Sequence, residues 1–120
     1  MGVEVQLEGG IVQGIGFTLI EDYVLNKKTG SVESTNFTSY KIPSATDVPD
    51  IEIILVEEHD PTGPFGAKGC GEAGQVTVGP AIANAIYNAI GVRLTDMPLT
   101  PEKILKALKQ KRANDNNGDK

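Results

Sequence analysis

Apolar residues recur at every fourth position near the start of the chain. The residues with this spacing are Val3, Leu7, Ile11, Ile15 and Leu19. It predicts a helix over residues 3–20, although each of the four glycines within that segment weakens a helix by roughly 1 kcal/mol relative to alanine. Gly10 and Gly14 fall one turn apart, so we expect a glycine face that another backbone or a ligand approaches closely. A glycine-loosened strand or loop is the alternative.

The middle of the chain shows strand patterns instead. Residues 23–25 and 31–38 predict a hairpin around a turn at residues 27–30, where Gly30 supplies a positive φ. Ile42 precedes Pro43 and must be extended. The clearest strand is residues 51–56 (IEIILV), which are mostly β-branched and apolar. We expect this strand to be central or well covered.

Two further helices are predicted in the second half. Residues 75–90 predict a helix whose regular part begins at Gly79 and Pro80, with residues 75–78 as a looser first turn. Isoleucines and alanines between Val78 and Ile90 mark one face of this helix, and Gly91 is a suitable stop. Thr100 is a suitable N-cap for a helix that ends near Lys111. We therefore expect an α+β fold, with a small antiparallel sheet of about three strands and about three helices. Residues 1–112 would form one domain segment, and residues 113–120 a disordered tail.

Composition narrows the function classes. The 120 residues make one domain at most, and a net charge of −5 gives no electrostatic basis for binding nucleic acid or an anionic membrane. The single cysteine excludes a disulfide within the chain. No apolar run approaches the roughly 20 residues of a membrane span. These features predict a cytoplasmic protein.

The densest candidate chemistry lies in residues 63–74 (GPFGAKGCGEAG), where five glycines surround one carboxylate, Glu72. Glu72 precedes a predicted helix, so it is either a surface residue that stabilises the helix dipole by roughly 0.3–1 kcal/mol or a general base enclosed among backbone atoms. Lys68 and the helix dipole would oppose the increase in proton affinity that a general base needs. The letters G-x-G-x-x-G at residues 69–74 also fit a dinucleotide fingerprint, but residues 60–68 separate them from the strand that the fingerprint requires.

Metal-ligating side chains are scarce. His59 is the only histidine and Cys70 the only cysteine, so the sequence predicts no zinc site. Gln6 and Gln13 are seven residues apart and share roughly one face of the predicted first helix. Either is a surface amide or a hydrogen-bond donor to a ligand on the glycine face.

Five motifs in register resemble the C-terminal part of the molybdopterin-binding large subunit of the xanthine dehydrogenase/aldehyde oxidase family. They are residues 6–14 (QLEGGIVQG), 40–43 (YKIP), 66–72 (GAKGCGE), 80–87 (PAIANAIY) and 99–102 (LTPE). The resemblance implies that Glu72 is the general base in oxidative hydroxylation of a heterocycle or aldehyde. It implies that Gln6 hydrogen-bonds the pterin and that Lys68, Gly69, Cys70 and Gly71 line the same wall.

The resemblance also implies a cofactor and partners. The cofactor is molybdopterin, with its cytosine dinucleotide form left open. The dithiolene sulfurs of the pterin hold the metal, so no protein metal ligands are expected, nor any cofactor on the isolated chain. The partners are the remainder of the molybdenum-binding subunit, iron–sulfur and FAD subunits or domains, and a small-molecule substrate, but neither nucleic acid nor membrane.

The family's subunits run to several hundred residues, so the chain is either part of a longer subunit or a short polypeptide that completes a split one. Alone it is expected to be inactive and to expose apolar surface, with self-association as a consequence. The alternative is a non-catalytic interaction or stabilising subunit with a vestigial site.

Overall fold

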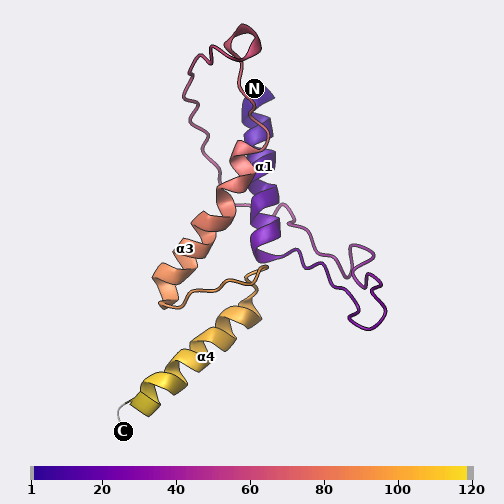
Figure 1. Cartoon of the computed structure of the whole chain (residues 1–120), viewed down its shortest axis with the longest axis vertical. Coiled ribbons are helices and arrows are strands. Elements are labelled where there is room, and N and C mark those ends of the chain that lie inside the picture. The colour runs from indigo at the N-terminus through magenta and orange to yellow at the C-terminus, as the bar shows by residue number, and fades with distance from the viewer. Residues whose placement is uncertain (1, 119–120) are drawn as a thin grey trace.

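The computed structural model describes residues 2–118 and consists of helices joined by long irregular segments (Figure 1). The elements in chain order are α1 (Gly2–Leu19), the 3-10 turn η1 (Pro64–Gly66), α2 (Ala73–Val76), α3 (Val78–Ile90) and α4 (Pro101–Gly118). The predicted helices at residues 3–20 and 75–90 are confirmed as α1 and α3, except that α3 begins at Val78 and residues 73–76 form the separate short helix α2. None of the helices in the described part of the chain is long and apolar enough to cross a membrane.

The α+β prediction with a small antiparallel sheet is wrong for the described residues. Across residues 2–118, the only β pairing is one isolated bridge between Leu25 and Val32. The predicted hairpin is reduced to this bridge and to a turn, in which Gly30 has a φ of +72°. Residues 51–56 form no strand, because a strand requires a neighbouring strand for its hydrogen bonds and these residues pair with no other strand within residues 2–118.

The first helix packs through glycines. A Cβ atom at Gly10 would lie 2.9 Å from the Gly71 carbonyl oxygen, and one at Gly14 would lie 2.8 Å from Cβ of Val78. In return, a Cβ at Gly74 would lie 2.9 Å from the Leu7 carbonyl oxygen. Missing side chains therefore let α1 approach the backbone of residues 71–75 and the Val78 side chain at the start of α3, as the glycine face predicts. By contrast, Ile15 is the only one of the five apolar residues with four-residue spacing that is buried.

The segment after α1 folds back onto its C-terminal end. Tyr40 donates a short hydrogen bond from its hydroxyl to Glu21, and this bond raises the pKa of Tyr40 above its ordinary value. Pro43 lies against Gly16, where a Cβ would come within 2.9 Å of the proline ring. The motif at residues 40–43 is thus an anchor on the first helix.

The third and fourth helices are joined by a defined corner. Gly91 ends α3 in the left-handed conformation (φ 66°) and its N–H donates to the Tyr87 carbonyl oxygen. Lys111 of α4 donates to the Ile90 carbonyl oxygen at 3.0 Å, a favourable place for a cation. The fourth helix, predicted to end near Lys111, continues to Gly118. Disorder of residues 113–120 as a tail stays a prediction, and residues 119–120 lie outside the described ones.

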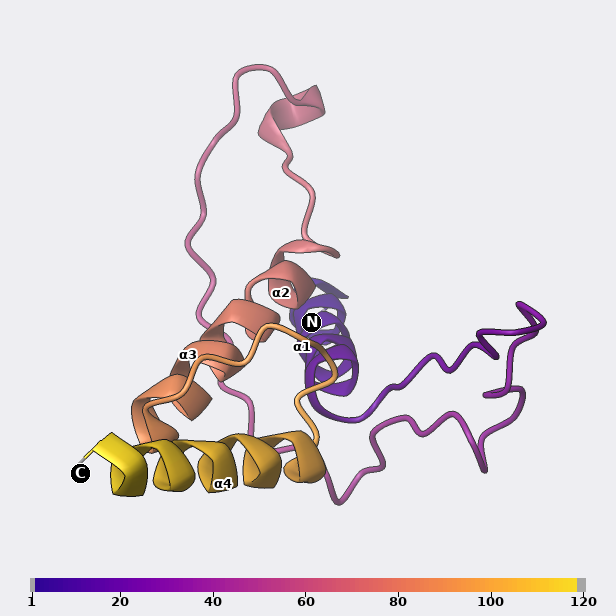
Figure 2. The same cartoon turned by 60° about the horizontal axis from the view of Figure 1, so that its bottom comes forward.

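The chain is elongated and has a small core. Its radius of gyration is 18.9 Å, whereas a compact domain of this length has about 14 Å. The buried apolar side chains of the described residues are Ile15, Leu99 and Ala107. Large apolar side chains at Phe37, Ile54 and Val56 are at least 76% exposed. Figure 2 shows two long loops leaving the helices in different directions.

Candidate functional site

Glu72 lies at the N-terminal boundary of α2. It occupies the N-cap position with φ −85° and ψ −23°, and its side chain makes no capping hydrogen bond. Its carbonyl oxygen instead accepts hydrogen bonds from the N–H groups of Gln75 (3.0 Å) and Val76 (3.2 Å). The residue is exposed. The backbone is therefore fixed by the helix while the carboxylate is left available to another group.

Packing within the described chain does not require glycine at the two glycine positions just before Glu72. A Cβ atom at Gly69 or at Gly71 would meet nothing within 4 Å, and neither residue has a positive φ. Other residues would fit both positions in this fold, unlike Gly10 and Gly74, which face backbone atoms. Glycine at residues 69 and 71 is explained if another molecule or chain approaches this face closely.

A shallow cavity of about 520 Å³ follows this loop, and its lining comprises Gly69, Cys70, Gly71, Glu72 and Ala73. The fit to a bulky planar cofactor is therefore favourable, because the wall combines two open glycine positions with an exposed carboxylate at its edge. Cys70 is a half-buried free thiol.

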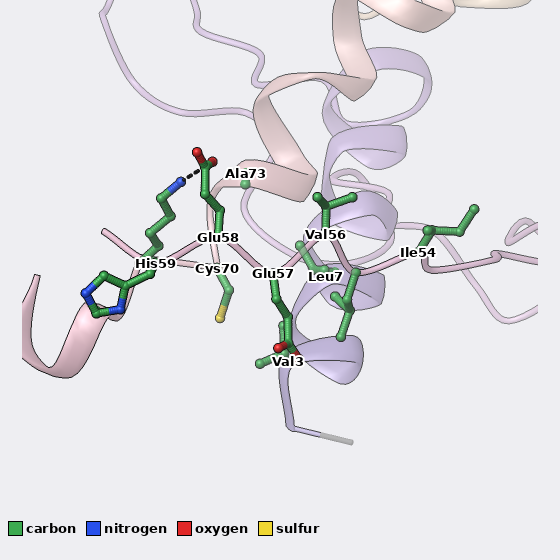
Figure 3. Close-up of a pocket in the computed structure, with 13 residues that line it drawn as sticks. Val3, Leu7, Ile54, Val56, Glu57, Glu58, His59, Cys70 and Ala73 are labelled. Atoms are coloured by element: carbon green, nitrogen blue, oxygen red, sulfur yellow. Dashed lines mark hydrogen bonds and ion pairs between the residues drawn. The ribbon is translucent and has the colours of Figure 1, made fainter. Parts of the chain in front are cut away.

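A second, larger open cavity of about 740 Å³ adjoins the same loop (Figure 3). It is bounded by residues 54–59, by residues 66–73 in part, and by Val3 and Leu7 of α1. Among these lining residues, Nζ of Lys68 lies 3.1 Å from Oε2 of Glu58. Lys68, the cation expected to act on Glu72, is thus paired with Glu58 instead. Both side chains are exposed, so this ion pair contributes little to stability.

The structure brings four predicted cofactor residues, Lys68, Gly69, Cys70 and Gly71, into one loop with Glu72. Gln6 comes from a different element. It is exposed on α1, one turn before Gly10, which contacts the Gly71 carbonyl group. Residues four apart share a face of a helix, so Gln6 lies on the side of α1 that faces residues 63–74, the glycine loop.

The described residues contain neither a group of metal-ligating side chains nor the strand of a dinucleotide-binding site. No group of three or more His, Cys, Asp or Glu side chains suited to a metal occurs within residues 2–118. The dinucleotide fingerprint requires a strand that runs into the glycines, and the described chain forms no strand there. His59 instead packs against Gly66, which has a φ of +79°.

Sequence reasoning missed the wall of the larger cavity. No sequence pattern linked Val3, Glu57 and Glu58 to the glycine loop. These residues come close to the loop only because residues 54–59 run past α1. The Lys68–Glu58 pair spans ten positions across an irregular loop. No helical or strand spacing could have identified it.

The chain is similar to molybdenum-binding proteins. Residues 1–49 match the family model described as "Molybdopterin cofactor-binding domain". The chain is 38% identical over 101 residues to the putative xanthine dehydrogenase molybdenum-binding subunit XdhA of Escherichia coli K12, covering 84% of the chain and 13% of that protein. It is 38% identical over 104 residues to the aldehyde oxidoreductase molybdenum-binding subunit PaoC of the same strain, covering 86% and 14%.

A solved structure shares the fold. The crystal structure of quinoline 2-oxidoreductase from Pseudomonas putida 86 matches with a TM-score of 0.81 and 35% identity, over 89% of this chain and 14% of that one. The chain therefore spans about one seventh of the relatives it matches. By sequence and by fold, it belongs to the xanthine dehydrogenase/aldehyde oxidase family of molybdenum hydroxylases, as a segment of the molybdenum-binding subunit.

Proposed function

We propose that this chain supplies the general-base carboxylate, Glu72, to a molybdenum hydroxylase that other polypeptide segments complete. The supporting observation is the exposed Glu72 carboxylate beside Gly69 and Gly71, whose Cβ positions are open and unexplained by internal packing. Relatives named as molybdenum-binding subunits of a xanthine dehydrogenase and of an aldehyde oxidoreductase support the reaction class.

The proposed chemistry is proton transfer at Glu72. The molybdenum–pterin group, when bound, supplies the two-electron oxidation of a heterocycle or aldehyde. A carboxylate oxygen of Glu72 accepts the proton released as the substrate is hydroxylated. An exposed carboxylate is a weak base, and burial strengthens it because the charged form loses solvation. The completing segments therefore have to cover Glu72.

The remaining candidates hold the pterin. Gln6 donates a side-chain amide hydrogen bond to it, and the bare backbone at Gly69 and Gly71 lets it approach. Lys68 and Cys70 line the same wall. The pterin carries molybdenum in the complete complex, with the cytosine dinucleotide form as one alternative. Partners are the rest of the molybdenum-binding subunit with iron–sulfur and FAD subunits or domains, and the isolated chain binds no molybdenum.

The test is co-expression with the missing molybdenum-binding segments and the iron–sulfur and FAD partners. Glu72→Gln keeps the size of the side chain and removes the proton acceptor. We expect kcat to fall by about 10²–10⁴-fold while the molybdenum content of the complex is unchanged. Glu57→Gln, in the neighbouring cavity, is the matched control. Wild-type turnover in Glu72→Gln would favour a non-catalytic stabilising subunit instead.

A further inference from the structure

Residues 51–56 are the least explained part of the chain. They combine β-branched, apolar residues with an extended, irregular backbone. Within the described chain, their N–H and C=O groups make no hydrogen bond. Since buried backbone groups are almost always paired, a segment this apolar is suited to a partner that supplies both cover and hydrogen bonds.

Both faces of this segment are apolar. Ile51 and Ile53 are half-buried on one face, whereas Ile54 is 78% and Val56 is 88% exposed on the other. Successive side chains of an extended segment point to opposite sides, and near-continuous apolar composition is typical of strands covered on both faces. Figure 2 shows the loop that contains these residues projecting away from α3. Its backbone edges are therefore accessible to another chain.

A second copy of this chain is a poor partner. Residues 50–58 contain the carboxylates of Asp50, Glu52, Glu57 and Glu58 and no lysine or arginine. Antiparallel self-pairing with Ile53 opposite Ile54 would place Asp50 of one copy opposite Glu57 of the other. Like charges directly opposite each other destabilise a strand pair. A strand with neutral or basic flanks is favoured.

We propose that residues 51–56 dock onto the remainder of the molybdenum-binding subunit by β-strand addition, pairing with a strand whose flanks are basic. This inference rests on the proposed function, because it takes the completing segment as the partner. The relatives support that partner, since the matched segment is only 14% of PaoC and of quinoline 2-oxidoreductase. In strand addition, backbone hydrogen bonds provide the affinity and alternate side chains provide the specificity.

The probe is PaoC of Escherichia coli K12 without the 104-residue segment that matches this chain, co-expressed with the full chain. Hydrogen exchange is measured on peptides that cover residues 51–56. We expect rapid exchange in the free chain and strong protection in the complex. Protection that appears in the free chain as its concentration rises would identify a second copy as the partner and overturn the proposal.

Proline variants separate backbone pairing from side-chain packing. Consecutive N–H groups point to opposite edges of a strand, so Ile54→Pro and Leu55→Pro test the two edges. We expect at least one of them to weaken binding about tenfold or more. Ile54→Thr and Leu55→Thr keep the N–H group and place a β-branched residue at each position, and we expect losses of less than about threefold. Circular dichroism verifies that the helices persist in every variant.

The outcomes distinguish the two proposals. If both proline variants bind as the wild type does, or if residues 51–56 stay unprotected in the complex, strand addition is refuted and the proposed function stands. If the wild-type chain forms no complex with truncated PaoC, the proposed completing role fails, and strand addition fails with it.

Discussion

Replacing Gly10 by alanine tests the backbone contact on which the site is built. Alanine in a helix interior is about 1 kcal/mol more favourable than glycine. At Gly10, however, the new Cβ would lie 2.9 Å from the Gly71 carbonyl oxygen and 3.4 Å from the Gln75 nitrogen. Both are backbone atoms, which cannot swing aside as a side-chain end does, and overpacking of this kind costs about 1–3 kcal/mol. The net expected change is a destabilisation of about 0–2 kcal/mol.

Gly9 is the matched control, because it lies one position earlier in the same helix and a Cβ there would meet nothing within 4 Å. Gly9→Ala should therefore stabilise the chain by about 1 kcal/mol. Urea unfolding of both variants, followed by circular dichroism at 222 nm, gives the difference in unfolding free energy, expected to be about 1–3 kcal/mol. If Gly10→Ala stabilised the chain as much as Gly9→Ala, the close contact between α1 and the glycine loop would be refuted.

Three further predictions concern the glycine loop, a helix end and the tip of the projecting loop. Gly69→Ala and Gly71→Ala should leave the urea midpoint of the isolated chain nearly unchanged, since both Cβ positions are open, yet lower the molybdopterin content of the reconstituted complex; unaltered pterin content would argue against a cofactor wall. Gly91→Ala should destabilise the chain by about 1–2 kcal/mol because Gly91 has a φ of +66°. Gly79→Ala should not, because the nearest atom to a Cβ at Gly79 would be 3.4 Å away. Equal urea midpoints of the two variants would contradict this. Hydrogen bonds from Thr62 lower the pKa of Asp60 below 3.8. The stabilisation from these bonds is therefore present above pH 3.8 and is lost as the pH falls through the lowered pKa. An NMR titration of the Thr62 amide should show a midpoint below 3.8, and a midpoint at or above 3.8 would disprove this.

Local signals predicted the helices well. The apolar face of residues 78–90 and the left-handed Gly91 depend on residues within a few positions, and α3 ends at Ile90 as they predict, although it begins at Val78 and not at Gln75. The first helix was predicted from its apolar spacing, but it packs mainly through Gly10 and Gly14. A single sequence indicates that glycine permits a close approach, without identifying the partner backbone.

The sheet was mispredicted because strand pairing is not local. Residues 51–56 have the composition of a strand, and composition does not reveal whether a partner strand lies in the same chain. The glycines around Glu72 drew attention to the loop as a candidate site. Their pattern could not reveal that Gly74 serves internal packing while Gly69 and Gly71 face open space, since that distinction depends on where α1 lies.

The rate of a single turnover tests the central claim most directly. In the reconstituted complex, substrate oxidation is followed by stopped-flow absorbance with Glu72 and with Glu72→Gln at equal molybdenum content. If Glu72 is the general base, the rate constant for substrate oxidation falls by about 10²–10⁴-fold in the variant. A rate constant for Glu72→Gln that equals the wild-type value would contradict the account.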